Sequence, residues 1–352
     1  MPDLDPADWL PLYRFACNHL VAPQWTAALE RRGWPAGIPD EARDALQALR
    51  MLNEARNRRL RDMLRETARL LNAVGIVPLP LKGAIALLPG QYPDAGDRIM
   101  GDLDIAVEPE QMQTAIDALH GAGYHLPPNL HPYLWRDTGH HHAPALAEPT
   151  GYGYVELHRA IYHQEPVSLA LPLAAVLAEA TRLDWEGVVL RVPSLRHRLI
   201  HNSLHYQFQD RAIFTDRRSL RSLLELARLR GMPEAATLDW PALLAALDGH
   251  GAGDALRLDL LATQTLFGMP LPAGVRPSPA ALALEGRFWW RLEHPRIHRG
   301  LDAWQDALKL GRRLRKLPHH AADPYWYPAL LWRIRYLWSS RRKDAARTLL
   351  VP

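Results

Sequence analysis

Residues 102–107 read DLDIAV, and residues 152–161 read YGYVELHRAI. Each stretch alternates apolar and polar side chains, which is the period of a strand with two different faces. The alternation puts Asp102 and Asp104 on one face of the first strand, opposite the apolar side chains between and after them. Glu156 lies on the polar face of the second strand. The two stretches predict a small sheet that carries three carboxylates.

The segments around these strands complete a small α/β unit, which we expect to span residues 76–166. Residues 76–83 (IVPLPLKG) predict a short buried strand that two prolines make irregular or place at an edge. A short helix is expected from Ala84 to Leu88, followed by a loop rich in Pro, Gly and Asp. Pro109 is expected to open a helix that Gly121 closes, between the two alternating strands.

Helical periodicity dominates on both sides of this unit. Residues 1–75 are expected to be helical, most clearly from Asn53 to Val74, where apolar residues recur at three- and four-residue spacings. After residue 167 the helical pattern returns, with helices predicted over Leu195–Phe208 and Arg218–Arg230. The predicted fold class is therefore α+β: a small mixed sheet with N-terminal helices and a mostly helical C-terminal region over residues 167–352.

Composition narrows the class of protein. The chain has 352 residues, a net charge of +4 and a single cysteine, Cys17, which excludes an intrachain disulfide framework. The N-terminus lacks a signal-peptide pattern, and no apolar run is long enough to cross a membrane. We therefore expect a cytoplasmic protein. Basic stretches such as Arg312–Lys343 are commoner as solvated helix faces than as polyanion sites, because acidic residues nearly balance them.

The three carboxylates suggest metal chemistry. Two aspartates separated by one residue on a strand point to the same side, close enough to bridge two metal ions, and a third carboxylate from a neighbouring strand completes the cluster. Magnesium prefers such hard oxygen ligands, and two magnesium ions can stabilise both the attacking and the leaving oxygen in nucleotidyl transfer. An isolated D-x-D is more often a solvent-facing pattern, so the surrounding sequence decides between the two readings.

Those surroundings carry a family resemblance. The stretch VPLPLKGAIALLPGQYPDAGDRIMGDLDIAVEPEQM (residues 77–112) resembles an uncharacterised family of bacterial nucleotidyltransferases within the DNA polymerase beta-like superfamily. The shared pattern is L-K-G, a tyrosine-containing loop, an arginine, D-h-D-h-h-V (h, apolar) and a later E-h-H strand, here Glu156 to His158. The resemblance is specific over about residues 50–165 and weaker over 195–230. It implies that the carboxylates of Asp102, Asp104 and Glu156 are catalytic and bind two Mg²⁺ ions.

The resemblance also implies how a nucleoside triphosphate, with ATP as the default, would be bound. Gly83 would let the backbone approach the triphosphate, with Ala84 beside it where the wider superfamily has a serine. Lys82 and Arg98 would contact phosphates. His158 would contact a phosphate or the acceptor, although a hydrogen-bonded structural histidine is about as common.

Histidines are conspicuous elsewhere too. His140, His141 and His142 are consecutive, and His197, His201 and His205 recur at four-residue steps on one predicted helix. Histidines spaced in this way can bind zinc, but no glutamate of an H-E-x-x-H motif and no cysteine accompanies them. We therefore favour structural roles, and we expect His201 and His205 at most to line the nucleotide cleft.

The sequence thus predicts an enzyme that moves a nucleoside monophosphate from a triphosphate to an unidentified hydroxyl on a small molecule, a peptide or an RNA, releasing pyrophosphate. G-x-S-x-G, Walker A and G-x-G-x-x-G motifs are absent, which removes the main competing folds. Two alternatives stay open: transfer of another group, such as a sugar from a nucleotide sugar, and a non-catalytic nucleotide-binding accessory protein. Peripheral membrane contact through Tyr325–Lys343 is a further but disfavoured reading.

Overall fold

The computed structural model describes residues 5–127, 140–163 and 167–294, together with positions 165, 297, 300 and 331. Within these ranges the chain is a mixed α+β structure, as predicted. The segment Tyr325–Lys343, considered above for membrane contact, lies outside the described residues except for Leu331. Among the described residues, no helix combines the length and the apolar character needed to cross a membrane.

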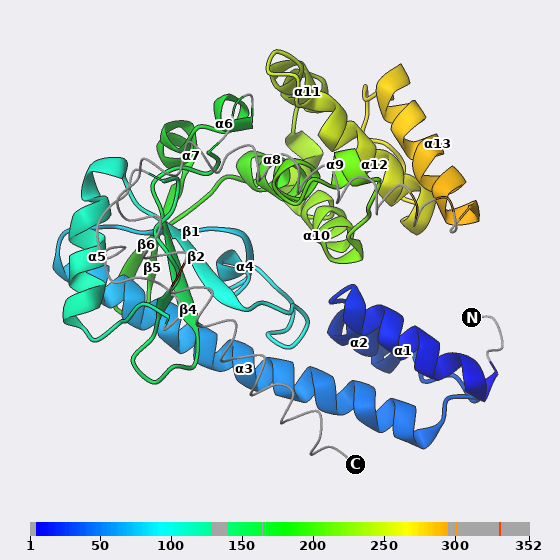
Figure 1. The fold of residues 1–352 in the computed structure, drawn as a ribbon, viewed down its shortest axis with the longest axis horizontal. Coiled ribbons are helices and arrows are strands. Elements are labelled where there is room, and N and C mark those ends of the chain that lie inside the picture. Colours follow the sequence, from blue (N-terminus) through cyan, green and yellow to red (C-terminus); the bar gives the residue numbers. More distant parts are fainter. Residues whose placement is uncertain are drawn as a thin grey trace.

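Four helical elements precede the sheet: η1 (Pro6–Asp8), α1 (Trp9–Asn18), α2 (Ala22–Arg32) and α3 (Asp40–Ala73). The helix predicted from Asn53 is the second half of α3, which has 34 residues. Its apolar stripe is buried, as the three- and four-residue spacing requires. In Figure 1, α3 runs from beneath the sheet out to α1 and α2, so one helix contacts both the N-terminal helices and the sheet.

The central sheet has four strands in the order β1 (Leu79–Pro80), β2 (Asp102–Ala106), β4 (Tyr154–His158) and β3 (Leu146–Ala147). The β2 and β4 strands are parallel and in register, so that Asp104 pairs with Glu156, and the two edge strands are antiparallel to them. The crossover between β2 and β4 contains η2 (Pro109–Gln111) and α5 (Met112–Gly121), as the Pro109 and Gly121 signals predict. The helix expected at Ala84 begins earlier, as α4 (Lys82–Ile85).

A hairpin of β5 (Thr181–Trp185) and β6 (Val188–Val192) lies within the region predicted to be mostly helical. Its two-residue turn has positive φ at both Glu186 and Gly187, the geometry that hairpin turns favour. The hairpin packs on α3 and β1, and the side chain of Asn72 bonds to both the N–H and the C=O of Val189. Trp185 is buried in the same core as the sheet.

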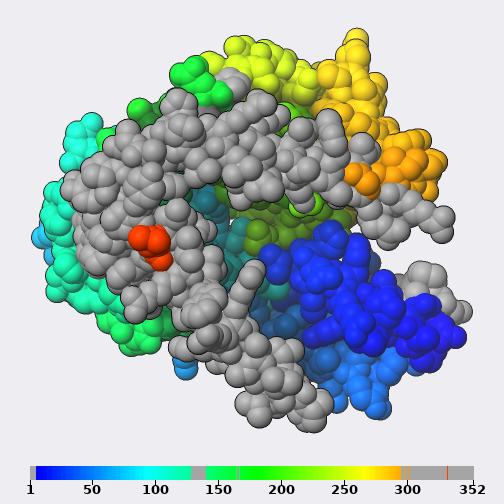
Figure 2. All heavy atoms as spheres, viewed as in Figure 1, coloured from blue at the N-terminus to red at the C-terminus, as the bar shows by residue number. Residues whose placement is uncertain are grey.

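Helices account for the rest of the described chain: α6 (Val167–Ala170), α7 (Leu173–Glu179), α8 (Leu195–Leu204), η4 (His205–Gln209), α9 (Ala212–Thr215), α10 (Leu220–Arg230), η5 (Pro233–Thr237), α11 (Trp240–Asp248), α12 (Gly253–Phe267) and α13 (Pro279–Glu293). The η4 segment is a π-helical continuation of α8, so both predicted helices in this region are confirmed. In Figure 2, the N-terminal helices (blue) and α13 (orange) form one end of the molecule, and α5 (turquoise) lies toward the other.

The sheet is covered on both sides by helices (Figure 1). One apolar core joins α3, α5 and the hairpin to the inward-facing residues of β2 and β4. A second core joins β1 and the end of β2 to α8, α10, α11 and α12. The polar face of β2 and β4 therefore opens toward the C-terminal helices, at the boundary between the two cores.

Candidate active site

The carboxylates of the two alternating strands meet on this polar face. Asp104 is only 5% exposed, and its neighbour across the ladder is Glu156. Side-chain ligand atoms of Asp104, Glu156 and His158 all lie within 4.8 Å of one another, close enough to share a metal ion. Asp102 lies two residues earlier on the same strand face and lines the adjoining cavity, but it is not part of this tight group.

Asp104 is the electrostatic centre of the group. Its Oδ1 accepts hydrogen bonds from Lys82 Nζ at 2.7 Å and from His158 Nε2 at 2.8 Å. Burial by itself opposes ionisation, but the His158 hydrogen bond and the Lys82 charge hold the pKa of Asp104 well below its usual range. Asp104 is therefore a fixed negative charge at any physiological pH.

The other two carboxylates lack such compensation. Asp102 has no ion pair or side-chain hydrogen bond with any described residue, and Glu156 Oε2 lies 3.8 Å from His158 Nε2, beyond hydrogen-bond distance. Burial raises the pKa of both carboxyls, and the negative charge of Asp104 raises it further. The three carboxylates are only partly compensated by nearby basic side chains, so they could bind a divalent cation. Carboxylate oxygens are hard ligands of the kind that magnesium prefers.

Lys82 and Gly83 place a positive charge beside the carboxylates. Lys82 has φ of 45°, in the left-handed region that non-glycine residues rarely adopt, which marks a position held by its surroundings. A Cβ on Gly83 would lie 2.5 Å from Nη1 of Arg98. The missing side chain therefore makes room for the Arg98 guanidinium. Ala84 is fully buried in the core on the other side of α4 and does not line the cavity.

A cavity of about 280 Å³ separates the carboxylates from the C-terminal helices. The strand side contributes Asp102 and Asp104, and α4 with the following loop contributes Lys82 and Arg98. The opposite wall comes from α8, η4 and α10, including Arg198, His201, Asn202, His205, Arg221, Ser222 and Glu225. The cavity thus has an acidic corner and several cations within one small volume.

The loop after α4 is fastened to α10 through Glu225. Arg98 Nε lies 3.4 Å from this carboxylate, Arg228 lies 2.7 Å from it, and the Tyr92 hydroxyl donates to it. Although burial opposes ionisation, the two arginines and their hydrogen bonds hold the pKa of Glu225 low. Arg198 bonds to the side chain of Gln91 in the same loop at 2.7 Å. These contacts fix Arg98 over Gly83.

Arg221 is a site residue that sequence reasoning missed. It is only partly exposed, lines the cavity, and forms no ion pair or side-chain hydrogen bond with any described residue. Burial and the nearby Arg98 lower its pKa, against the attraction of Asp210 and Asp102. An arginine that faces a cavity without a partner is a ready anion ligand. Its only signal in the sequence was a place in the arginine-rich helix 218–230.

The histidines of α8 and η4 contribute neutral rings to the wall. His201 and His205 both line the cavity, as predicted. Burial and the Lys82 charge lower the pKa of His205 to about 3, and burial holds that of His201 well below its usual value. His197 instead lies near Ser194 and Glu179. No group of possible metal ligands among the described residues includes these three histidines.

The site and the comparisons with known proteins agree. The model of a protein family described as uncharacterised nucleotidyltransferase matches residues 5–268. The chain belongs to this family, and it is accordingly a nucleotidyltransferase enzyme with a possible metal site at Asp104, Glu156 and His158. No curated protein and no solved structure matches the chain.

Proposed function

We propose that the protein transfers a nucleoside monophosphate from a nucleoside triphosphate to a hydroxyl acceptor in a magnesium-dependent reaction. One observation carries this proposal: Asp102 and Asp104 line a single small cavity together with Lys82, Arg98 and Arg221. Carboxylates suit the metal ions, and the cations suit the triphosphate. A bound metal–phosphate complex needs both ligand types together.

Each residue then has a defined task. Asp102, Asp104 and Glu156 would hold two magnesium ions, which when bound neutralise charge on the phosphates and lower the pKa of the attacking hydroxyl. Arg98 and Arg221 would bind the phosphates that leave as pyrophosphate. The acceptor oxygen forms a bond to the α-phosphorus, and the bond from that phosphorus to the leaving oxygen breaks. Glu156, whose pKa burial and Asp104 raise, would take the acceptor proton.

The test uses Asp102→Asn because this residue has no ion pair with any residue that the structure describes. Asp104→Asn would also remove the bonds from Lys82 and His158, so its effect would mix catalysis with structure. Wild type and Asp102→Asn are incubated with labelled triphosphates, Mg²⁺ and cell extract, and the labelled product is identified by mass. We expect labelling to fall by at least about a hundredfold, with unchanged thermal melting.

Asp44→Asn is the matched control, because Asp44 is exposed on α3, far along the chain from the site, and the change in charge is the same. It should label the acceptor at the wild-type rate. Equal labelling by Asp102→Asn and wild type would refute the metal mechanism. A product heavier by a hexose rather than by a nucleoside monophosphate would show that the same site transfers a sugar.

A further inference from the structure

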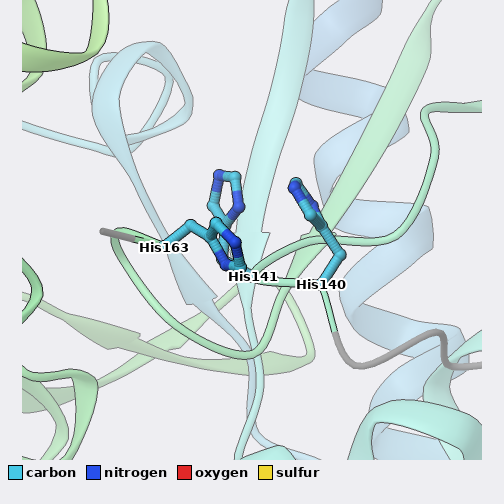
Figure 3. A group of neighbouring side chains, drawn as sticks. All are labelled: His140, His141 and His163. Carbon is cyan, nitrogen blue, oxygen red and sulfur yellow. The ribbon is translucent and has the colours of Figure 1, made fainter. Parts of the chain in front are cut away.

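A second cluster of possible metal ligands lies next to the carboxylates. His140, His141 and His163 each offer a ring nitrogen, and these nitrogens lie within 4.8 Å of one another. Figure 3 shows the three rings gathered together although two separate segments carry them, one before β4 and one after it. His163 lies more than twenty residues from the other two in the sequence, so only the fold brings it to them.

The backbone holds both segments in place. His141 C=O accepts from the backbone N–H of Arg159 at 2.9 Å, and His142 forms an isolated bridge with His158. The segment that carries His163 is anchored by Ile161 and Tyr162, which are both buried. The ligand positions are therefore fixed by the end of β4, and the rings need only side-chain rotations to converge.

The ring of His141 is buried, and one of its nitrogens lacks a hydrogen-bond partner among the described residues. His141 is 8% exposed, and its Nδ1 is buried without a hydrogen-bond partner in the described part of the chain. A buried polar atom of this kind calls for water or an ion. Metal ions bind the neutral form of an imidazole ring through such a free nitrogen.

We infer that His140, His141 and His163 form a binding site for a divalent transition-metal ion such as zinc, separate from the magnesium site. Imidazole nitrogen favours zinc and similar borderline metals, whereas magnesium prefers the oxygens of the carboxylate site. A tetrahedral ion with Zn–N distances of about 2.0–2.1 Å needs ligand nitrogens about 3.3 Å apart. Small ring rotations would bring the observed nitrogens to that spacing, and three protein ligands leave a fourth position open.

The ion would lie beside the strand that carries Glu156 and His158. The ring of His141 is 6.1 Å from that of His158, centre to centre, and His158 bonds to Asp104. The bound metal would tie the two segments that flank β4 to each other. The sequence alone favoured structural roles for His140 and His141, because no glutamate of an H-E-x-x-H motif and no cysteine accompanies them.

The experiment uses the full-length chain without a histidine tag, stripped with a chelator and kept in excess Mg²⁺. Titration with Co²⁺ should give one equivalent bound with the intense visible absorption of tetrahedral cobalt, which Zn²⁺ then displaces. His140→Asn and His163→Asn change exposed rings, so they should fold normally and weaken Co²⁺ binding by at least about tenfold.

Two control variants separate this site from others. His250→Asn alters an exposed histidine in the turn after α11, and Asp102→Asn alters the carboxylate site; both should bind Co²⁺ as wild type does. Wild-type affinity in His163→Asn, or no Co²⁺ binding by the wild-type chain, would overturn the inference. Loss of binding only in Asp102→Asn would assign the cobalt to the carboxylates instead. None of these readouts depends on transferase activity.

Discussion

At the scale of single residues, the two aspartates of β2 differ in their hydrogen-bond partners. Asp104 is bonded by a lysine and a histidine, whereas Asp102 has no such partner among the described residues. The strand alternation correctly placed both on one face, because side-chain direction follows from the backbone period alone. It gave no information on the partners of Asp104, which come from α4 and β4.

Gly83→Ala tests the close approach of Arg98. The new Cβ would lie 2.5 Å from Arg98 Nη1, the far end of a flexible side chain. The end of the arginine must shift and Met100 Cβ, 3.3 Å from the new atom, must yield slightly, so we expect a small drop in melting temperature. We expect KM for the triphosphate to rise by about tenfold or more, because a charge-assisted phosphate contact is lost. Gly121→Ala is the control, since nothing lies within 4 Å of its added Cβ; an equal KM in both variants would contradict the role of Arg98.

Asp259 provides a prediction on pH and stability. It is buried on α12 with Gln207 Nε2 at 2.5 Å, and burial raises its pKa to about 6. The folded state therefore holds this proton more tightly than the unfolded state does. Its stabilising contribution is present below about pH 4, the unfolded pKa, and is lost as pH rises through about 6.

Asp259→Asn cannot ionise and keeps the oxygen that accepts from Gln207. We expect its free energy of unfolding to match that of wild type near pH 4 and to exceed it by about 3 kcal/mol near pH 8. Urea denaturation at both pH values measures the difference. A variant equally destabilised at both values would mean that packing, not charge, sets the effect.

At the scale of elements, the loop between α4 and β2 depends on one buried carboxylate. Glu225 is paired with Arg98 and Arg228, and breaking a buried ion pair from one side leaves the remaining charges unpaired. We expect Glu225→Gln to lower the free energy of unfolding by about 3 kcal/mol and to speed amide exchange in residues 89–101. Tyr92→Phe removes one hydrogen bond to the same carboxylate but no charge, so it should cost clearly less. Equal losses would show that the hydroxyl, not the charge, fastens the loop.

The same scale shows where sequence patterns succeed. The strands β2 and β4 and the helix α5 were predicted because alternation, proline and glycine are local signals. The hairpin β5–β6 was missed, although TRLD-WEGV-VLRV contains alternation and a turn with glycine. The polar residues of this segment are equally common in exposed helices, so the local sequence is ambiguous. The packing of β6 on α3 and β1 favours the hairpin. Arg221 and His163 could not be assigned for the same reason: their neighbours are tertiary.

At the scale of the whole molecule, the apolar cores do not follow the predicted boundaries at residues 75 and 166. Trp185 and Leu190 of the hairpin share a core with Leu64 and Leu71 of α3 and with the sheet. We therefore expect a fragment of residues 76–166 to lack cooperative thermal unfolding, because it keeps α5 but loses α3 and the hairpin, which cover the rest of the apolar face. A fragment of residues 40–192 contains α3 and the hairpin. It should show helical circular dichroism and a broad thermal unfolding transition. Cooperative melting of the shorter fragment would establish 76–166 as an independent domain.

The ion pair between Lys82 and Asp104 would couple the binding of the metal ion to the binding of the triphosphate. While it persists, the lysine charge is neutralised and one oxygen of the aspartate is occupied. Free magnesium would draw Asp104 away from the lysine, and a free triphosphate that drew the lysine away would leave the aspartate with His158 alone. Only the preassembled metal–nucleotide complex replaces both partners in one step. Each ligand should therefore raise the protein's affinity for the other. Either ligand alone would bind weakly, and the two together would bind more tightly.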